Sequence, residues 1–313
     1  MATPDMDLII IGAGPAGLTA AQYGARSNLR VLVIEELAPG GQVLRIDMLE
    51  NYPGIIPAKA GDEFAGDLHR QAEGFGAQFI TESVLSLEKS GDLFTVNLGN
   101  GEKRSAYTAI VATGAKHRTL DVPGEKEFYG RGVSYCATCD GPFFRGKKIF
   151  VAGGGDAACD EAQYLARLTN RVVVVHRRDR FRAQKALAER TLGNPNIEVR
   201  FNTHIIEIKG DQKVSSVVLE KTSGETWEED AGAVFVFAGT VPQAAFLPAD
   251  ITRDEGGYIV TDQTMASSLP GLFVAGDVRA TPFRQVVVAA GEGAVAAHSA
   301  AAYIDSVKGD VYK

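Results

Sequence analysis

The hydrophobic and polar positions of this chain predict the same order of elements twice. In each copy an apolar strand runs into a glycine-rich turn, a helix-forming stretch follows, and a β-branched strand comes next. The four elements are predicted over residues 7–11, 12–17, 18–26 and 30–34 in the first copy, and over 148–152, 153–158, 159–168 and 171–175 in the second. This order is typical of doubly wound α/β units built around a parallel sheet.

Each copy is followed by short strands that predict a small antiparallel insert, and then by a closing apolar strand. Turns such as Gly91 and Asn100-Gly101 separate the insert strands. These strands are predicted over residues 84–87, 94–98 and 102–107 in the first copy and near 205–208 and 214–219 in the second, with closing strands over 109–112 and 233–238. We therefore predict an α/β protein with two Rossmann-like, doubly wound dinucleotide-binding domains, each with a small antiparallel β insert.

One segment near the C-terminus stays unpaired in this pattern. Residues 271–277 predict a short strand and a glycine turn, and an alanine-rich helical stretch covers residues 286–304, but no second strand follows. A single strand and helix cannot bury both of their faces alone, so this segment must complete one of the two domains. The hydrophobic pattern does not indicate which one.

Glycine is the unusual feature of the composition, with 35 of 313 residues, about 11% against a usual level of about 7%. The apolar fraction of 45% and the charged fraction of 23% are ordinary for a globular protein. The glycine excess therefore indicates tight turns and close backbone approaches rather than disorder.

Charge and hydrophobicity exclude several classes of protein. The net charge of −7 lacks the basic footprint of a nucleic-acid-binding protein. Apolar runs such as 172–175 and 233–238 are far shorter than the roughly 20 residues of a membrane span. The apolar run 8–11 breaks at Gly12, which makes a poor signal peptide. Three cysteines cannot form a disulfide framework, so we expect a cytoplasmic location. From the charge and the short apolar runs, we expect no nucleic-acid or membrane partners.

The first glycine turn has the residues that a dinucleotide-binding site needs. It reads Gly12-Ala-Gly14-Pro15-Ala16-Gly17, and Pro15 suits the first turn of the helix. The first glycine permits the tight turn, the second lets the backbone approach a pyrophosphate, and the third packs the helix on the sheet. The helix start supplies N–H donors for the phosphates, and Glu35 can accept hydrogen bonds from a ribose diol. The alternative is an ordinary βαβ turn without a ligand.

The second glycine turn, Gly153-Gly154-Gly155-Asp156-Ala157-Ala158, is followed by the opposite charge. Its strand leads into His176-Arg177-Arg178, with Arg180 and Arg182 close behind, where the first copy has Glu35-Glu36. An acid there favours a free 2′-hydroxyl, whereas arginines suit a 2′-phosphate. The two sites therefore predict FAD and NADPH, respectively. The alternatives are a solvated basic surface for the arginines and a packed histidine for His176.

Cys136-Ala-Thr-Cys139 is a C-x-x-C motif followed directly by Asp140. A zinc site needs about four ligands, but the sequence has no second C-x-x-C or histidine pair, and two inert buried thiols are a further alternative. A redox dithiol is favoured, because the spacing allows an intrachain disulfide and the adjacent carboxyl can supply a proton for thiol–disulfide exchange. Cys159 is most simply a small buried residue of the helix after the second turn.

The dithiol precedes the second glycine turn and so belongs with the second domain. A nicotinamide, a flavin and a disulfide together form one electron path. With these features the chain resembles the low-molecular-weight, bacterial-type thioredoxin reductases, which are class II pyridine nucleotide-disulfide oxidoreductases. The resemblance covers nearly the whole length. Its motifs are Gly12–Gly17, Gly40-Gly41-Gln42, Ala112–Ala115, Cys136–Asp140, Gly153–Asp156, His176–Arg182, Gly276-Asp277 and Arg284-Gln285.

The resemblance implies the domain organisation and the activity. The FAD-binding domain would be discontinuous, with residues 1–116 and 246–313, and residues 117–245 would form the NADPH-binding domain that carries the dithiol. Electrons would pass from NADPH through FAD and the dithiol to the disulfide of thioredoxin. The family is homodimeric, and its NADPH domain rotates between two states, which places hinges near residues 115–118 and 242–247.

The resemblance also implies roles for single residues. Cys139 would be the thiol nearest the flavin, Cys136 would attack the thioredoxin disulfide, and Asp140 would be the general acid/base. Asp277 would lie near the FAD pyrophosphate and ribityl chain. The expected FAD-binding residues are Gly12, Gly14, Pro15, Ala16, Gly17, Glu35, Glu36, Gly41, Gln42, Asn51, Thr113, Gly114, Asp277, Arg284, Gln285 and Val286. The expected NADPH-binding residues are Gly153, Gly154, Gly155, Asp156, Ala157, His176, Arg177, Arg178 and Arg182, and no metal ligands are expected.

The chain departs from the family pattern at two positions. Ala157 stands where the family often has serine, which removes one phosphate contact, and Phe283 stands where tyrosine is frequent. Other proteins of similar fold fit less well. A dithiol oxidase typically lacks the nicotinamide motif, a ferredoxin reductase would lack both cysteines, and a hydroperoxide-reductase flavoprotein would carry an N-terminal dithiol module. A non-catalytic redox sensor would bind flavin without turning over thioredoxin.

Overall fold

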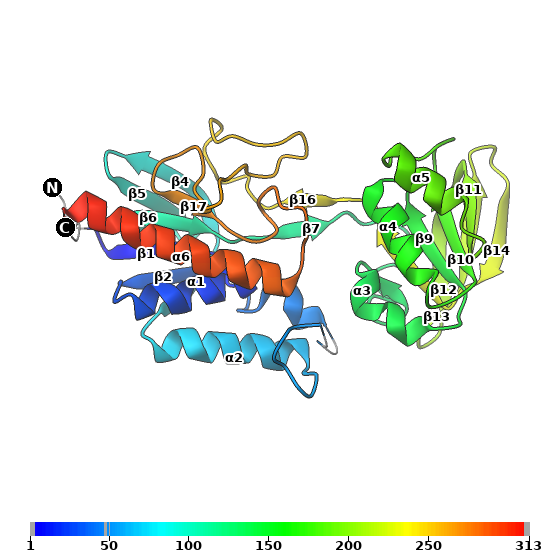
Figure 1. The fold of residues 1–313 in the computed structure, drawn as a ribbon, viewed down its shortest axis with the longest axis horizontal. Helices are drawn as coiled ribbons and strands as arrows, with labels where there is room; N and C mark the ends of the chain where they lie inside the picture. The colour runs from blue at the N-terminus through cyan, green and yellow to red at the C-terminus, as the bar shows by residue number, and fades with distance from the viewer. Residues whose placement is uncertain (1–3, 47–48, 50, 310–313) are drawn as a thin grey trace. The chain divides into compact units, whose positions relative to one another are not determined.

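The computed structural model describes residues 4–46, 49 and 51–309, and the chain forms two compact units (Figure 1). Unit 1 consists of Met1–Lys116 and Val241–Lys313, and unit 2 consists of His117–Thr240. The chain enters unit 2 through β7 (Ala115–His117) and returns through β16 (Thr240–Pro242), and these two short strands pair.

The second boundary lies earlier in the chain than the sequence indicated. The predicted boundary followed residue 245, whereas unit 2 ends at Thr240. Ala244 is buried in a hydrophobic cluster of unit 1, and the Gln243 N–H donates to the Gly114 carbonyl at 2.9 Å. These contacts hold the returning chain to unit 1. The predicted ends of the first domain, residues 1–3 and 310–313, lie outside the described residues.

Unit 1 is built on a seven-stranded sheet. Its strands are β1 (Met6–Ile11), β2 (Val31–Glu35), β3 (Gln78–Thr81), β4 (Val84–Ser90), β5 (Leu93–Leu98), β6 (Lys103–Val111) and β17 (Leu272–Val274). The order is β3-β2-β1-β6-β5-β4, with β17 also paired with β6. The pairs among β1, β2, β3, β6 and β17 are parallel, and β4–β5 and β5–β6 are antiparallel. This confirms the doubly wound sheet with an antiparallel insert.

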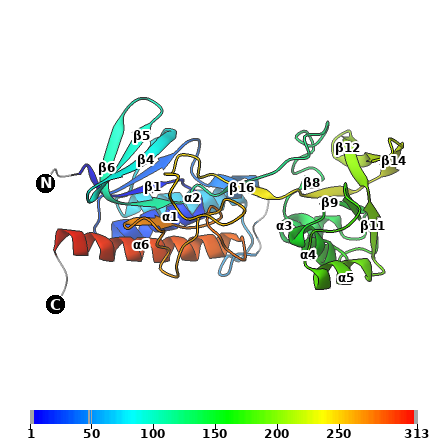
Figure 2. The same ribbon diagram turned by 90° about the horizontal axis from the view of Figure 1, so that it is seen from above.

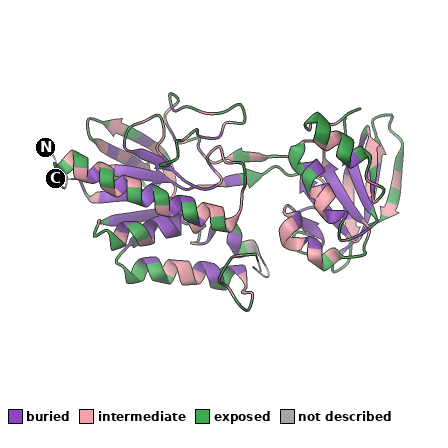
Figure 3. Ribbon diagram, viewed as in Figure 1, coloured by how far each residue is buried: buried purple, intermediate pink, exposed green. Residues whose placement is uncertain are grey.

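The side chains of β1 alternate between two cores, as the period of a strand requires. Leu8 and Ile10 belong to the hydrophobic cluster that includes Leu18 of α1 (Pro15–Arg26). Ile9 and Ile11 belong to the opposite cluster, which contains Phe94 and Val96 of β5. Because the sheet is covered on both faces, all four residues are nearly inaccessible to water (Figure 3).

The C-terminal segment that the pattern left unassigned lies in unit 1. Its strand, β17, extends the sheet beside β6, and its helix, α6 (Val286–Lys308), lies alongside α1 (Figures 1 and 2). A Cβ at Gly293 would stand 2.1 Å from the Ala16 carbonyl oxygen, so the α6 backbone packs directly on the start of α1. By length and composition α6 could also cross a membrane, but one such helix is weak evidence, because Ala296 and Ala300 lie in the core.

Unit 2 repeats this architecture with a smaller sheet. Its strands are β8 (Val133–Ser134), β9 (Ile149–Gly153), β10 (Val172–His176), β11 (Ile197–Phe201) and β15 (Ala233–Phe237), in the order β11-β10-β9-β15-β8. All these pairs are parallel. The antiparallel insert consists of β12 (Thr203–Gly210), β13 (Val214–Lys221) and β14 (Thr226–Asp230). The insert packs on one face of the sheet, and α4 (Asp156–Leu165) packs on the other.

Several predicted boundaries were wrong. The strands predicted over 102–107 and 109–112 form one strand, β6, because the polar residue between them, Thr108, is fully buried and donates to the Gly271 carbonyl at 2.5 Å. The helix after the second turn begins at Asp156 and not at residue 159. The pattern missed β3, β11, β14, α2 (Gly61–Gly74), α5 (Lys185–Leu192) and the short α3 (Ala137–Asp140).

Candidate active site

The first glycine turn lies between β1 and α1, and its three glycines meet different surroundings. A Cβ at Gly12 would stand 2.6 Å from the Ala112 carbonyl oxygen, and one at Gly17 would stand 1.9 Å from the Gly12 carbonyl oxygen. Gly12 also has φ +99°, which favours glycine. At Gly14, by contrast, no atom lies within 4 Å of the Cβ position. Gly14 therefore leaves open space where a ligand can approach the backbone.

Glu35 ends β2 and closes the same turn from the side. Its carboxylate accepts hydrogen bonds from the Ala13 N–H at 2.7 Å and from the Leu37 N–H at 3.2 Å. The neighbouring Glu36 is exposed. Glu35 thus orients the glycine turn, and α1 begins at Pro15 without a side-chain cap, so its first N–H groups are not engaged by a capping side chain.

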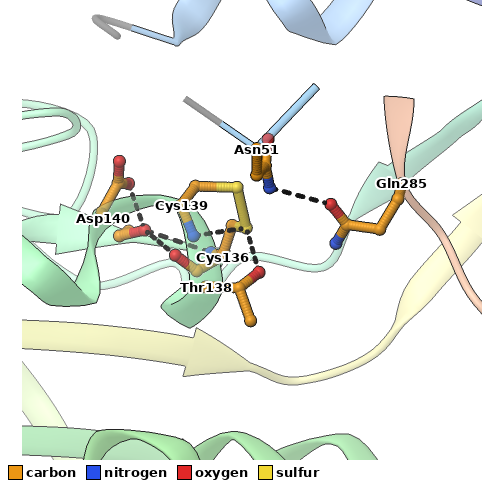
Figure 4. Close-up of a disulfide and its surroundings, with 7 residues drawn as sticks. Asn51, Cys136, Thr138, Cys139, Asp140 and Gln285 are labelled. Carbon is orange, nitrogen blue, oxygen red and sulfur yellow. Dashed lines mark hydrogen bonds between the residues drawn. A yellow bond between two sulfur atoms is a disulfide. The ribbon is translucent and has the colours of Figure 1, made fainter. Parts of the chain in front are cut away.

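Predicted residues from distant parts of unit 1 meet around this turn. The Gly40 N–H donates to the Ala13 carbonyl at 2.7 Å, and a Cβ at Gly41 would stand 3.1 Å from the Gly14 Cα. Gln42 donates from Nε2 to the Ala115 carbonyl at 2.8 Å. The Asn51 amide donates to Oε1 of Gln285 at 3.2 Å (Figure 4), and Thr113 Oγ1 donates to the Gln243 carbonyl at 2.5 Å.

Asp277 and Arg284 supply charge near the start of α6. Burial raises the pKa of Asp277 to about 6; the Arg284 guanidinium opposes this rise, and the Glu292 carboxylate adds to it. Arg284 lies over the Tyr258 ring at 4.3 Å, and its Nε is buried without a hydrogen-bond partner in the described part of the chain. The open backbone at Gly14 and this unpartnered donor fit a bound group that carries phosphates and hydrogen-bond acceptors.

The second glycine turn joins β9 to α4. A Cβ at Gly153 would stand 2.7 Å from the Phe237 carbonyl oxygen, and one at Gly154 would stand 2.4 Å from the His176 ring. Around Gly155, which precedes α4, no atom lies within 4 Å of the Cβ position. The arrangement matches the first turn: two glycines are required by packing, and the one before the helix faces open space.

His176 and Asp156 are engaged within the protein. His176 is 7% exposed beneath Gly154, and burial lowers its pKa, as do the nearby Arg182, Arg178 and Arg177. The Asp156 carboxylate accepts from the Gln184 N–H at 2.7 Å and from its side-chain amide at 3.2 Å. Both side chains therefore contact the segment around the turn, and their predicted part in binding NADPH stays a prediction.

The arginines after β10 lie at the surface of unit 2. Arg177, Arg178, Arg180 and Arg182 are exposed, and none of them is ion-paired with an acidic side chain among the residues that the structure describes. The Arg182 N–H donates to the Gly154 carbonyl at 2.7 Å, which ties the arginine segment to the glycine turn. The segment therefore offers positive charge next to the open side of Gly155.

Cys136 and Cys139 form a disulfide at the start of the short helix α3, with their Cα atoms 5.4 Å apart (Figure 4). The Cys136 Sγ accepts from the Cys139 N–H at 3.2 Å and lies 3.4 Å from Thr138 Oγ1. Both contacts stabilise negative charge on this sulfur when the disulfide opens. The pairing engages both thiols in the intrachain disulfide that the spacing allows, and Cys159 is buried on α4.

The structure adds residues that the motifs did not indicate. Ser134 Oγ donates to the Asp140 carboxylate at 2.5 Å, and Glu292 accepts from the Gly276 N–H at 2.8 Å and forms an ion pair with Arg279. Ser134 lies two residues before the C-x-x-C motif in sequence, so proximity was a usable signal. Glu292 lies 16 residues after Gly276, within an alanine-rich helix, and only its charge among apolar neighbours marks it.

Two glycine turns, each following a parallel strand of a separate sheet, together with a redox-capable disulfide, define a flavin- and nicotinamide-type disulfide oxidoreductase. A model of the pyridine nucleotide-disulphide oxidoreductase family matches residues 6–293, and the chain belongs to this family.

Relatives narrow the assignment within the family. The chain is 56% identical to the thioredoxin reductase of Treponema pallidum, over 97% of this chain and 99% of that protein. It is 44% identical to the thioredoxin reductase of Listeria innocua, over 96% and 95%. The crystal structure of thioredoxin reductase from Streptococcus pyogenes matches with a TM-score of 0.90 at 43% identity, over 96% of this chain and 98% of that chain. The resemblance to low-molecular-weight thioredoxin reductases is thereby confirmed.

Proposed function

We propose that this chain is an NADPH-dependent thioredoxin-disulfide reductase. The observation that carries the proposal is the Cys136–Cys139 disulfide, which has an Asp140 carboxylate beside it and lies in the same unit as an arginine-flanked glycine turn. Near-full-length relatives that are 41–56% identical are thioredoxin reductases. Electrons pass from NADPH through FAD and this dithiol to the disulfide of thioredoxin.

Unit 1 holds FAD in this proposal. The open backbone at Gly14 and the uncapped start of α1 would hold the pyrophosphate, and Glu35 would accept hydrogen bonds from the ribose. The remaining predicted residues around this turn, at 41–42, 51, 113–114, 277 and 284–286, line the cofactor. The unpartnered Arg284 Nε supports this, because a buried donor requires an acceptor.

Unit 2 holds NADPH against the second turn. Gly155 leaves room for the pyrophosphate, and Arg177, Arg178 and Arg182 supply charge for a 2′-phosphate. His176 supports the turn from beneath, because its ring is buried against Gly154. The exposed arginines, and not the histidine, are therefore the contacts that we assign to the phosphate.

Bound flavin supplies a two-electron carrier between the nicotinamide and the disulfide. In the reduced chain, the Cys136 thiolate attacks one sulfur of the thioredoxin disulfide, whose S–S bond breaks as a mixed disulfide forms. The departing thioredoxin sulfur takes a proton from Asp140. The Cys139 thiolate then attacks Cys136 Sγ, which restores the Cys136–Cys139 disulfide and releases the second thioredoxin thiolate, which takes a proton from water. The dithiol is oxidised, and thioredoxin is reduced by two electrons.

The proposal extends to assembly and motion. We infer a cytoplasmic homodimer in which unit 2 turns relative to unit 1 between a state for flavin reduction by NADPH and a state for dithiol reduction. The paired strands β7 and β16 form the hinge, because they are where the chain crosses between the units.

An NADPH-oxidation assay with the thioredoxins of the same organism tests the function. We expect a yellow protein that is bleached by NADPH and that turns over with thioredoxin. Replacing Cys139 with serine should abolish thioredoxin reduction and leave NADPH-to-flavin transfer largely intact. A non-catalytic redox sensor would bleach but would not turn over, and turnover by Cys139→Ser would contradict the dithiol relay.

A further inference from the structure

Ser134 lies where the sheet of unit 2 meets the dithiol. It is the last residue of the edge strand β8, pairs with Phe235 of β15, and is 3% exposed. Strand β8 leads through one residue to Cys136, the N-cap residue of α3. A side chain at the Ser134 position is held by the sheet, whereas Cys139 and Asp140 lie on a helix of four residues.

The Ser134 hydroxyl connects the backbone of Cys136 to the side chain of Asp140. Its oxygen accepts from the Cys136 N–H at 3.1 Å, and lies 2.5 Å from Oδ2 of Asp140. An ionised carboxylate can only accept, so the single hydroxyl proton points to Asp140. The contact to the Cys136 carbonyl at 3.3 Å is longer and competes for the same proton.

This connection fixes the carboxylate relative to the sulfur that attacks the substrate. The backbone of Asp140 is held by a hydrogen bond from its N–H to the Cys136 carbonyl at 3.1 Å. The Ser134 hydroxyl acts on the side chain: it restrains the torsions of the carboxyl group, and proton transfer depends on a well-defined heavy-atom distance. A donor on a strand is a more rigid support than one on a loop.

We propose that Ser134 is a positioning residue for the proton transfer that Asp140 performs during thiol–disulfide exchange. The inference rests on the proposed function. Ser134 takes no part in hydride transfer and does not contact the substrate. It holds the Asp140 carboxyl group, which in its protonated form gives a proton to the departing thioredoxin sulfur as the Cys136–thioredoxin bond forms, and which is left as the carboxylate that accepts the Ser134 hydrogen bond.

Unit 2 contains a second buried serine that donates to a carboxylate, and its replacement is a matched control for Ser134→Ala. Ser216 on β13 is also buried, at 8% exposed, and donates to a carboxylate, that of Glu228, at 2.6 Å. This pair belongs to the antiparallel insert and not to the sheet that carries the dithiol. Ser216→Ala therefore removes the same kind of hydrogen bond without touching the exchange site.

The experiment measures two half-reactions of the flavin-loaded protein: flavin reduction by NADPH, and reduction of thioredoxin or of a small aromatic disulfide. Ser134→Ala is expected to slow disulfide reduction about tenfold, a part of the 10²–10⁴-fold effect of a positioned acid, with flavin reduction changed less than about twofold. Ser134→Thr, which keeps the hydroxyl, should recover most of the rate, and Ser216→Ala should match the wild type in both steps. Ser134→Gly serves as a second removal of the hydroxyl if the alanine variant folds poorly.

A double-mutant cycle separates positioning from a general structural effect. In an Asp140→Asn background, Ser134→Ala should slow exchange no further, because the two residues act as one unit. Additive losses, or equal slowing of both half-reactions, would overturn the inference. If the wild type reduces the small disulfide but not thioredoxin, the proposed partner is wrong and Ser134 is still tested. If it reduces neither, the function and the inference fall together.

Discussion

Two neighbouring glycines of the second turn have different physical reasons to be glycine. A Cβ at Gly154 would stand 2.4 Å from the buried His176 ring, whereas the Cβ position of Gly155 is open. Gly154→Ala should therefore lower the melting temperature, because the ring and turn cannot both keep their positions. Gly155→Ala should leave the melting temperature within about 2 °C but weaken NADPH binding at least tenfold, since the methyl group takes the space of the ligand.

Thermal unfolding and NADPH titration distinguish the two variants. FAD content should be unchanged in both, because the flavin site that we propose lies in unit 1. A destabilised Gly155→Ala protein, or a Gly154→Ala protein with wild-type stability, would contradict this account of the turn.

We expect Asp277 to link the stability of unit 1 to FAD binding. Each pKa unit is worth about 1.4 kcal/mol, so a rise to about 6 destabilises the ionised form in the flavin-free fold by up to about 3 kcal/mol. The folded state binds this proton more tightly than the unfolded state, so the stabilisation present at low pH is lost as the pH rises from about 4 to about 6.

Asp277→Asn should remove this pH dependence. We expect the flavin-free variant to be more stable than the wild type at pH 8, by about 1–3 kcal/mol in urea unfolding. The same variant should retain less FAD after purification. A flavin-free variant that is less stable than the wild type at pH 8 would show that the Asp277 carboxylate is not strained by burial.

In unit 1, the buried carboxylate of Asp7 connects three segments that are far apart in sequence. Asp7 of β1 pairs with Arg30, which precedes β2, at 3.1 Å, and with Lys308, the last residue of α6, at 2.8 Å. Burial opposes ionisation, but these hydrogen bonds hold the pKa of Asp7 at about 2. The stabilisation is therefore present above pH 4 and is lost as the pH falls toward 2.

Asp7→Asn should loosen the docking of α6 on the sheet. We expect a loss of about 1–2 kcal/mol at pH 7, a moderate value because Arg30 and Lys308 are partly solvated. The loss should shrink in urea unfolding at pH 3. Asp5→Asn, at an exposed neighbour that bonds Ser105, is the matched control. An equal loss from both variants would contradict the special role of Asp7.

The elements that sequence predicted best are those whose signal is local. The strands of the two parallel sheets are continuous β-branched runs, and the glycine turns follow them directly. Helices α2 and α5 were missed because exposed polar residues dilute their apolar faces. Strand β14 alternates between exposed and half-buried positions at the edge of its sheet, so it has no strong hydrophobic period.

At the scale of the whole molecule, the parts of the site that sequence predicted are those with a local sequence signal, and the parts that it missed depend on contacts between distant segments. The dithiol and both glycine turns are contiguous motifs, so their chemistry is readable from spacing. The Asn51–Gln285 hydrogen bond joins residues 234 positions apart, and the Gly276–Glu292 contact depends on how α6 docks. Such contacts are set by tertiary packing, which no local pattern encodes.

We expect the distribution of charge over the molecule to determine whether NADPH is preferred to NADH. A net charge of −7 repels a polyanionic ligand, while the arginine segment after β10 is exposed and not ion-paired among the described residues. NADPH carries a 2′-phosphate that NADH lacks, and each charged hydrogen bond to it is worth about 1.5–3 kcal/mol. We therefore expect NADPH to bleach the flavin far faster than NADH, and a rise in ionic strength to narrow the difference.

Replacing Arg177 and Arg178 together with alanine should lower kcat/KM for NADPH about 100-fold, the equivalent of two lost contacts. The value for NADH should stay within about threefold, because its ribose makes no such contacts. Lys185→Ala, which removes an exposed charge from the start of α5, should change neither. An equal loss of activity with both nucleotides would mean that the arginines support the fold of the turn and do not bind the 2′-phosphate. The basic segment would then be an ordinary solvent-exposed surface.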